Sequence, residues 1–226
     1  MATLLTMIAN FHRFCGVEGV TLLVGPDKGK FLIHKDILCE ASRYFDAAFS
    51  SGFKEATEQT LALEQENPRI VESFINWIYT GRLNYVVPKD RTTVPLYEEP
   101  LELYLLADKY EVPKLRRQLV QYFYDLRSNH TLQPLATFTR LYDKTTDNDG
   151  LRKLFIDMMV WEGDDVWFRL KGWDEWILNN AEIAKDLVAA AFDRIKHPRD
   201  NPMETKDASM YFVTEATTTR KSTKES

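Results

Sequence analysis

The fold is decided by residues 20–81, which read VTLLVGPDKGKFLIHKDILCEASRYFDAAFSSGFKEATEQTLALEQENPRIVESFINWIYTG. Residues 20–24 are a short β-branched and apolar run, and residues 31–33 are a second. Residues 25–29, Gly-Pro-Asp-Lys-Gly, have the chemistry of a tight turn, so the two runs predict an antiparallel hairpin. In residues 59–63 two leucines fall on one face of a predicted third strand, because side chains alternate along a strand.

The best-specified helix of the chain follows this strand. Asn67 is a favourable N-cap, and Pro68 at the first helical position loses no hydrogen bond because that N–H has no partner in a helix. Gly81 can take the left-handed conformation that ends a helix. Its predicted apolar stripe consists of Ile70, Val71, Phe74, Ile75 and Ile78.

Further helices are predicted around this small sheet. Pro100 opens one behind Glu98 and Glu99, whose charges suit the positive end of a helix dipole, and Pro113 opens another. The helix after Pro113 is expected to bury Leu115, Leu119, Tyr122, Phe123 and Leu126. Two later amphipathic helices carry the apolar sets Leu151, Leu154, Phe155, Met158, Met159 and Ile183, Leu187, Val188, Ala191, Phe192, Ile195. The pattern indicates an α+β fold: a small, mostly antiparallel sheet flanked by helices, with a helical C-terminal extension.

Composition narrows the class of protein. The 226 residues are 44% hydrophobic and 12% aromatic, which is enough for a substantial core. A net charge of −5 gives no attraction to nucleic acid or to an acidic membrane surface. The two cysteines, Cys15 and Cys39, are typical of a reducing compartment, and no uncharged apolar run approaches the roughly 18 residues of a membrane span. We therefore expect an intracellular protein, in cytoplasm or nucleus, without a membrane or nucleic-acid partner.

Five short strings follow one another along the first half of the chain. They are FLIHK with Ile37-Leu38-Cys39 at 31–39, SRYF at 42–45, FKEA at 53–56, WIYTG at 77–81 and ADKYEVP at 107–113. In this order they resemble the BTB/POZ domain, in which the histidine of the first string is structural, and the last string is similar to a helix-to-helix corner of fungal members. The resemblance implies a BTB/POZ fold over residues 16–126 and a non-enzymatic protein-interaction function. The chain departs from the family at Glu18-Gly19, where Ser-Asp usually stands, and in the long connection from Asn84 to Glu99.

The resemblance also implies a dimer interface. BTB domains often pair through an N-terminal helix, and residues 1–15 are predicted as an amphipathic helix with the apolar side chains Leu4, Leu5, Ile8 and Phe11. These side chains would join two copies of the chain, or this chain and another BTB protein. The alternative is that the helix packs on its own domain.

A second implied contact is Phe53-Lys54-Glu55. Some BTB proteins bind a cullin-type ubiquitin-ligase scaffold at this place through an apolar residue, any residue and a glutamate. Phe53 would enter a pocket while the Glu55 carboxylate accepts hydrogen bonds at its edge; alternatively Phe53 covers the core and Glu55 is a solvated charge. Two functions stay open: a substrate adaptor that docks a cullin, and an assembly or transcription-regulatory BTB protein that does not.

The second half carries no motif that names a function. Residues 127–196 are predicted as the helical extension, and Trp161, Trp167, Trp173 and Trp176 indicate either a helix-packing core or a binding face. From His197 onward the charges alternate and serine and threonine accumulate, which predicts a disordered tail over residues 197–226.

Catalytic and metal-binding patterns are missing from the sequence. The histidines His12, His34, His130 and His197 are scattered, and no Cys-x-x-Cys or His-Glu-x-x-His spacing occurs. Cys39 lies on an apolar helix face, as a small core residue would. We expect no enzymatic activity, no cofactor and no metal.

Overall fold

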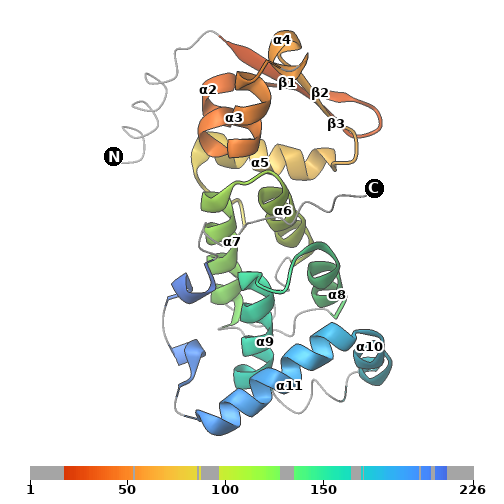
Figure 1. The fold of residues 1–226 in the computed structure, drawn as a ribbon, viewed down its shortest axis with the longest axis vertical. Coiled ribbons are helices and arrows are strands. Elements are labelled where there is room, and N and C mark those ends of the chain that lie inside the picture. The colour runs from red at the N-terminus through yellow and green to blue at the C-terminus, as the bar shows by residue number, and fades with distance from the viewer. Residues whose placement is uncertain are drawn as a thin grey trace. The chain divides into compact units, whose positions relative to one another are not determined.

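A computed structural model describes residues 18–52, 54–85, 87, 97–127, 135–163, 169, 171–198, 200–204 and 207–212. The chain divides into two compact units (Figure 1). The first unit comprises Met1–Val86 and Leu96–Leu119, and the second comprises Val87–Pro95 and Val120–Ser226.

The sheet of the first unit has three strands in the order β2-β1-β3. β1 (Gly19–Val24) pairs antiparallel with β2 (Gly29–His34), and it pairs parallel with β3 (Thr60–Leu63). Val20, Leu22 and Val24 are fully buried on one face, and Leu61 and Leu63 of β3 are buried too. The predicted hairpin and the one-sided burial of the third strand are confirmed.

Three short helices lie between β2 and β3: α2 (Lys35–Ala41), α3 (Arg43–Ser50) and α4 (Lys54–Glu58). Ser42 separates the first two because its extended backbone breaks the helix and its side chain caps α3 by accepting a hydrogen bond from the Phe45 N–H at 3.1 Å. Phe45 and Phe49 of α3 are then directed into the core.

α5 (Pro68–Thr80) has the predicted ends. The Asn67 side chain accepts from the Arg69 N–H at 3.0 Å, and Gly81 ends the helix in the left-handed region at φ 67°. Ile70, Val71 and Phe74 are buried as predicted, but Ile75 and Ile78 are only half-buried because Trp77 occupies the core instead. In Figure 1, α5 runs beneath the sheet.

α6 (Glu98–Lys109) and α7 (Pro113–Leu126) meet at a corner in which Glu111 has a φ of 53°. α6 begins at Glu98, so Pro100 stands within its first turn, where a missing N–H costs no hydrogen bond. The five side chains predicted to point inward from α7 are all buried. The division between the two units falls within this helix, after Leu119.

The second unit also contains α8 (Leu135–Lys144), α9 (Gly150–Glu162), α10 (Trp173–Asn179) and α11 (Ala181–Lys196). α9 is its central helix, because every residue from Gly150 to Met159 except Lys153 is buried. Arg152 is 3% exposed, donates to Glu182 and to the carbonyls of Tyr142 and Thr145, and so joins α8, α9 and α11. Trp173 and Trp176 pack on each other with ring centroids 5.1 Å apart, which favours the packing interpretation of these two tryptophans.

Two features of this unit differ from the sequence prediction. On α11 only Ile183 of the predicted apolar face is buried, whereas Val188, Phe192 and Ile195 are exposed. Within the predicted disordered tail, η3 (Pro202–Glu204) and η4 (Ser209–Tyr211) are short 3-10 helices that bury Met203 and Tyr211. For these residues the structure differs from the predicted disorder, because Met203 and Tyr211 are buried in the second unit.

Candidate functional site

Glu55 is the member of the predicted scaffold motif that the structure places. It lies in the first turn of α4, whose last residue is followed by Gln59 with a left-handed φ of 48°. The Gln59 carbonyl accepts from the Thr21 N–H of β1 at 2.9 Å, and the Thr60 hydroxyl donates to the Glu58 carbonyl at 3.1 Å. These bonds hold α4 against the sheet, so that Glu55 has a fixed place on the first unit.

The Glu55 carboxylate is not part of the ion pair of α4. Lys54 pairs with Glu58 at 3.6 Å across one helical turn. Glu55 is half-exposed, and its carboxylate has no hydrogen-bond or ion-pair partner among the residues that the structure describes. Phe53, the apolar member of the motif, lies outside the described residues, as do the predicted dimer residues Leu4, Leu5, Ile8 and Phe11. Of the residues predicted for the two contacts, Glu55 is the one that the described part of the chain contains.

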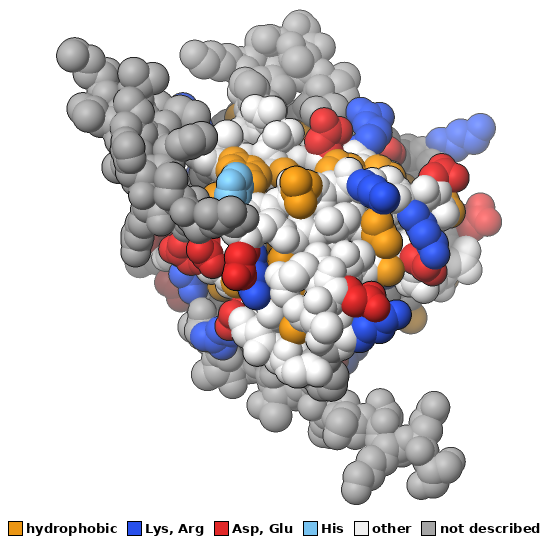
Figure 2. Space-filling model, turned by 90° about the horizontal axis from the view of Figure 1, so that it is seen from above, with side chains coloured by type: hydrophobic (Ala, Val, Ile, Leu, Met, Phe, Trp, Pro, Cys, Tyr) orange, Lys and Arg blue, Asp and Glu red, His pale blue; other side chains and the backbone are white. Residues whose placement is uncertain are grey.

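The sheet end of the first unit presents a mixed surface. On the face that Figure 2 shows, hydrophobic side chains are interspersed with acidic and basic ones. Leu32 of the edge strand β2 is 77% exposed, and Tyr44 and Tyr79 are 40% exposed. Apolar side chains scattered singly among charges are ordinary on a protein surface and do not by themselves mark a binding site.

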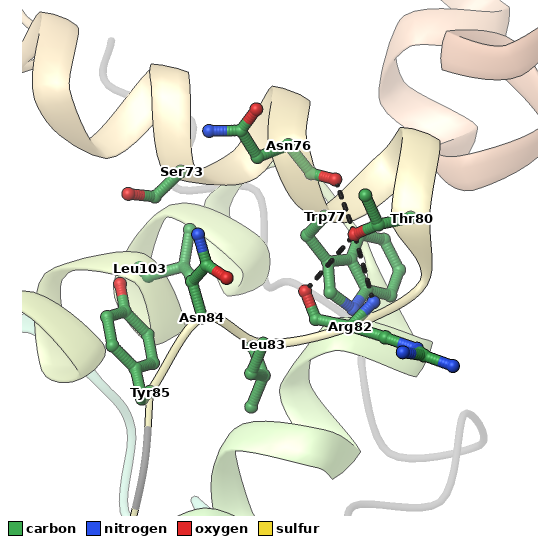
Figure 3. Close-up of a pocket in the computed structure, with 9 residues that line it drawn as sticks. All are labelled: Ser73, Asn76, Trp77, Thr80, Arg82, Leu83, Asn84, Tyr85 and Leu103. Carbon is green, nitrogen blue, oxygen red and sulfur yellow. Dashed lines mark hydrogen bonds between the residues drawn. The ribbon is translucent and has the colours of Figure 1, made fainter.

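A cavity of about 160 Å³ lies elsewhere on the first unit, and sequence reasoning gave no sign of it (Figure 3). Its lining comes from α5, from the extended segment after Gly81 and from α6, and consists of Ser73, Asn76, Trp77, Thr80, Arg82, Leu83, Asn84, Tyr85 and Leu103. Ligand sites for drug-sized molecules have volumes of about 300–1,000 Å³, so this cavity is small for a nucleotide cofactor.

Hydrogen bonds fix part of the cavity wall. Ser73 and Tyr85 both donate to the Glu99 Oε1, at 3.0 and 3.2 Å. The Trp77 indole N–H donates to Gln118 at 2.8 Å. The side-chain amides of Asn76 and Asn84 have no partner among the described residues. An amide both donates and accepts, so these two side chains can bind water or another polar group.

The titratable side chains of the first unit take part in packing and hydrogen bonding. His34 Nδ1 and the Tyr79 hydroxyl are 2.7 Å apart, which agrees with the structural role expected of this histidine. Burial is the main cause that raises the pKa of the Cys39 thiol, and a raised pKa lowers the share of reactive thiolate. Burial and the nearby Glu66 carboxylate also raise the pKa of Tyr110. Among the described residues no cluster of three His, Cys, Asp or Glu side chains could hold a metal ion.

Within the described part of the chain, no helix is both long and apolar enough to cross a membrane.

Known proteins are similar to part of this chain. Kelch repeat and BTB domain-containing protein 8 of Xenopus tropicalis is 26% identical over 141 residues, which is 60% of this chain and 22% of that protein. Kelch-like protein 25 of Homo sapiens is 30% identical over 80 residues, which is 35% of this chain and 13% of that protein. The chain therefore spans less than a quarter of the length of these relatives.

Among solved structures, the BTB (Tramtrack and Bric a brac) domain of human gigaxonin is similar with a TM-score of 0.38 and 18% identity, over 54% of this chain and 89% of that one. The family model described as BTB/POZ domain matches residues 16–126. That segment contains the three-stranded sheet and α2 to α7. Residues 16–126 therefore form a BTB/POZ domain, a fold whose general role is protein–protein interaction and not catalysis.

Proposed function

We propose that the protein is a non-enzymatic adaptor whose BTB/POZ domain docks a cullin-type ubiquitin-ligase scaffold through Phe53 and Glu55. The observation that carries the proposal is the unengaged Glu55 carboxylate on α4, in a chain whose residues 16–126 match the BTB/POZ family. A half-exposed carboxylate on a helix that is tied to the sheet can accept hydrogen bonds from a partner without first breaking an internal ion pair.

The rest of the adaptor proposal concerns assembly. Leu4, Leu5, Ile8 and Phe11 pair two copies of the chain, or this chain with another BTB protein, and the domain works in cytoplasm or nucleus. The proposed boundaries are an N-terminal helix over 1–15, the domain over 16–126, the extension over 127–196 and a C-terminal segment from 197, of which Met203 and Tyr211 are buried in the second unit. The fungal type indicated by residues 107–113 stays a prediction, since the relatives named above are vertebrate.

The test is co-purification of the full chain with cullin from its host. We expect wild type to capture the cullin and the double variant Phe53→Ala/Glu55→Lys to lose it, because the variant removes the apolar contact and reverses the charge of the acceptor. Glu72→Lys is the matched control, since it makes the same charge change at an exposed glutamate of α5, away from α4. The comparison counts when all three proteins keep the wild-type circular dichroism and oligomeric state.

Either of two results would overturn cullin docking: equal capture by all three proteins, or capture by none. The protein would then be an assembly or transcription-regulatory BTB module. Light scattering of an Ile8→Glu/Phe11→Glu variant tests the dimer separately. A wild-type dimer that becomes a monomer in the variant supports pairing through the N-terminal residues, and a dimer in both proteins contradicts it.

A further inference from the structure

Helix α11 has apolar side chains on two faces. Its inner face is held on the second unit: Ile183 is 1% exposed, the Asp186 carboxylate accepts from the Tyr142 hydroxyl at 2.8 Å, and Arg194 lies over the Trp161 ring at 5.0 Å. Its outer face carries Val188, Phe192 and Ile195, which are 55, 60 and 73% exposed. A helix that is apolar on both faces is expected to be covered on both.

The outer face has the spacing of a helix-docking seam. Ala184, Val188, Ala191 and Ile195 follow one another at intervals of four, three and four residues, which is the spacing of the two inward positions of a heptad. Phe192 stands beside this seam and can cover it from one side. The two alanines let another helix approach closely, because their methyl side chains are small. The seam therefore fits a helix better than an extended strand or a loop.

The charges around the outer face of α11 indicate which charges a helix that binds there should carry. Lys185 and Lys196 are exposed and have no ion-pair partner among the described residues. The acidic residues of α11 are turned away or engaged: Glu182 pairs with Arg152 and Asp186 accepts from Tyr142. Asp193 is the residue after Phe192, so it lies about 100° further round the helix. The seam is thus bordered by positive charge on the side where Phe192 lies.

A second copy of the chain is a poor occupant. In an antiparallel pair of α11 helices centred between Ala190 and Ala191, Lys185 of each copy lies opposite Lys196 of the other, and like charges at such positions are destabilising. In a parallel pair the lysine edge of one copy meets the alanine edge of the other, which offers the lysines no opposite charge. An acidic partner supplies that opposite charge.

We infer that the outer face of α11 docks an amphipathic helix of a partner protein, whose apolar stripe is bordered by glutamate or aspartate. The inference rests on the proposed adaptor function and names the kind of partner that the second unit takes. Its test uses α11 variants and peptides, whereas the cullin test uses α4 variants, so that either can fail without the other.

The probes are two synthetic helical peptides of three heptads with leucine at the inward positions. One has glutamate at the flanking positions and the other has lysine, so each repels itself and stays single. Fluorescence anisotropy measures their binding to the full chain. We expect the acidic peptide to bind at least about tenfold more tightly than the basic one, Phe192→Ala to weaken it about tenfold, and Lys185→Glu/Lys196→Glu to invert the preference.

Two control variants keep the test specific to this face. Lys144→Glu/Lys171→Glu makes the same change of net charge at exposed lysines elsewhere on the second unit, and Leu32→Ala shortens an exposed leucine of the first unit. Both should bind the acidic peptide as wild type does. No binding, equal binding of both peptides, or the same loss in the controls would overturn the inference.

Two other results would also overturn it, by assigning another occupant. If light scattering gives a smaller mass for Phe192→Ala than for wild type, the face joins copies of this chain. If vesicles of phosphatidylserine and phosphatidylcholine bind wild type but not Lys185→Glu/Lys196→Glu, the face meets a lipid surface.

Discussion

At the scale of single residues, the second unit depends on polar groups inside its core. Tyr211 is 1% exposed and its hydroxyl donates to the Asp157 carboxylate at 3.0 Å. Burial is the main cause that raises the pKa of Asp157 above its ordinary value of 3.8, while the Tyr211 hydrogen bond and the charge of Lys153 act to lower it. The folded state therefore holds this proton more tightly than the unfolded chain does.

This difference predicts a pH dependence that Asp157→Asn should remove. As pH rises above about 4, the unfolded chain releases the proton first, so the free energy of unfolding of wild type falls until pH passes the raised pKa. The asparagine side chain of the variant would keep an acceptor for Tyr211 but has no proton to lose. We expect the variant to gain stability relative to wild type over that window and the difference to level off above it.

Urea unfolding at a series of pH values measures this effect, with the exposed Asp143→Asn as control. The control should follow wild type. A difference between Asp157→Asn and wild type that stays constant across the series would contradict the raised pKa.

At the scale of elements, Ser42 joins the end of α2, the start of α3 and the corner before α7. Its hydroxyl accepts from the Phe45 N–H and donates to the Tyr110 carbonyl, and the side chain is 1% exposed. Ser42→Ala leaves both backbone groups buried without a partner, so we expect the free energy of unfolding to fall by about 2–3 kcal/mol. Urea unfolding followed by circular dichroism measures it.

Ser50→Ala is the matched control for that loss. The Ser50 hydroxyl donates to Asp46 at the exposed end of α3, so its removal should change stability by less than about 0.5 kcal/mol. Equal effects of the two substitutions would mean that the buried cap contributes no more than an exposed hydroxyl.

Elements whose limits depend on local chemistry could be predicted from the sequence. Asn67, Pro68 and Gly81 set the ends of α5 through groups within a few residues of each helix end, and the turn between β1 and β2 is likewise local. The face that a helix buries is a tertiary property. The periodicity of α11 identified a helix, but it could not tell which of two apolar faces would meet α9 and which would stay exposed.

The candidate site was predictable only where a resemblance supplied the position. Glu55 was named from its place in a family pattern, and its carboxylate has no partner among the described residues, while Lys54 pairs with Glu58. Asn76 and Asn84 have no sequence signal, because exposed asparagines are common on helix ends and loops. Their cavity arises from the path of the chain after Gly81.

At the scale of the whole molecule, the residues after α11 complete the core of the second unit. Met203, Ala208 and Tyr211 are at most 4% exposed, and Arg127 donates to the Met203 carbonyl at 3.0 Å. A Cβ atom at Gly150 would lie 1.8 Å from the Tyr211 carbonyl oxygen, so glycine at the start of α9 permits this close approach. Met203, Ala208 and Tyr211 follow neither the helical nor the strand spacing within a polar stretch, which is why the sequence predicted disorder.

Truncation can test this role of the C-terminal residues. A chain that ends at His197 loses Met203 and Tyr211, whereas a chain that ends at Phe212 keeps them and every contact described here. Burying one large apolar side chain contributes about 1.5–3 kcal/mol, so the shorter chain should lose about 3 kcal/mol of unfolding free energy after the entropy of ordering the segment is subtracted. Urea unfolding followed by tryptophan fluorescence reports on it, because most tryptophans belong to this unit. If both truncated chains unfold at the wild-type midpoint, residues 200–212 are not part of the core; a loss in the shorter chain alone makes them the last layer of the second unit.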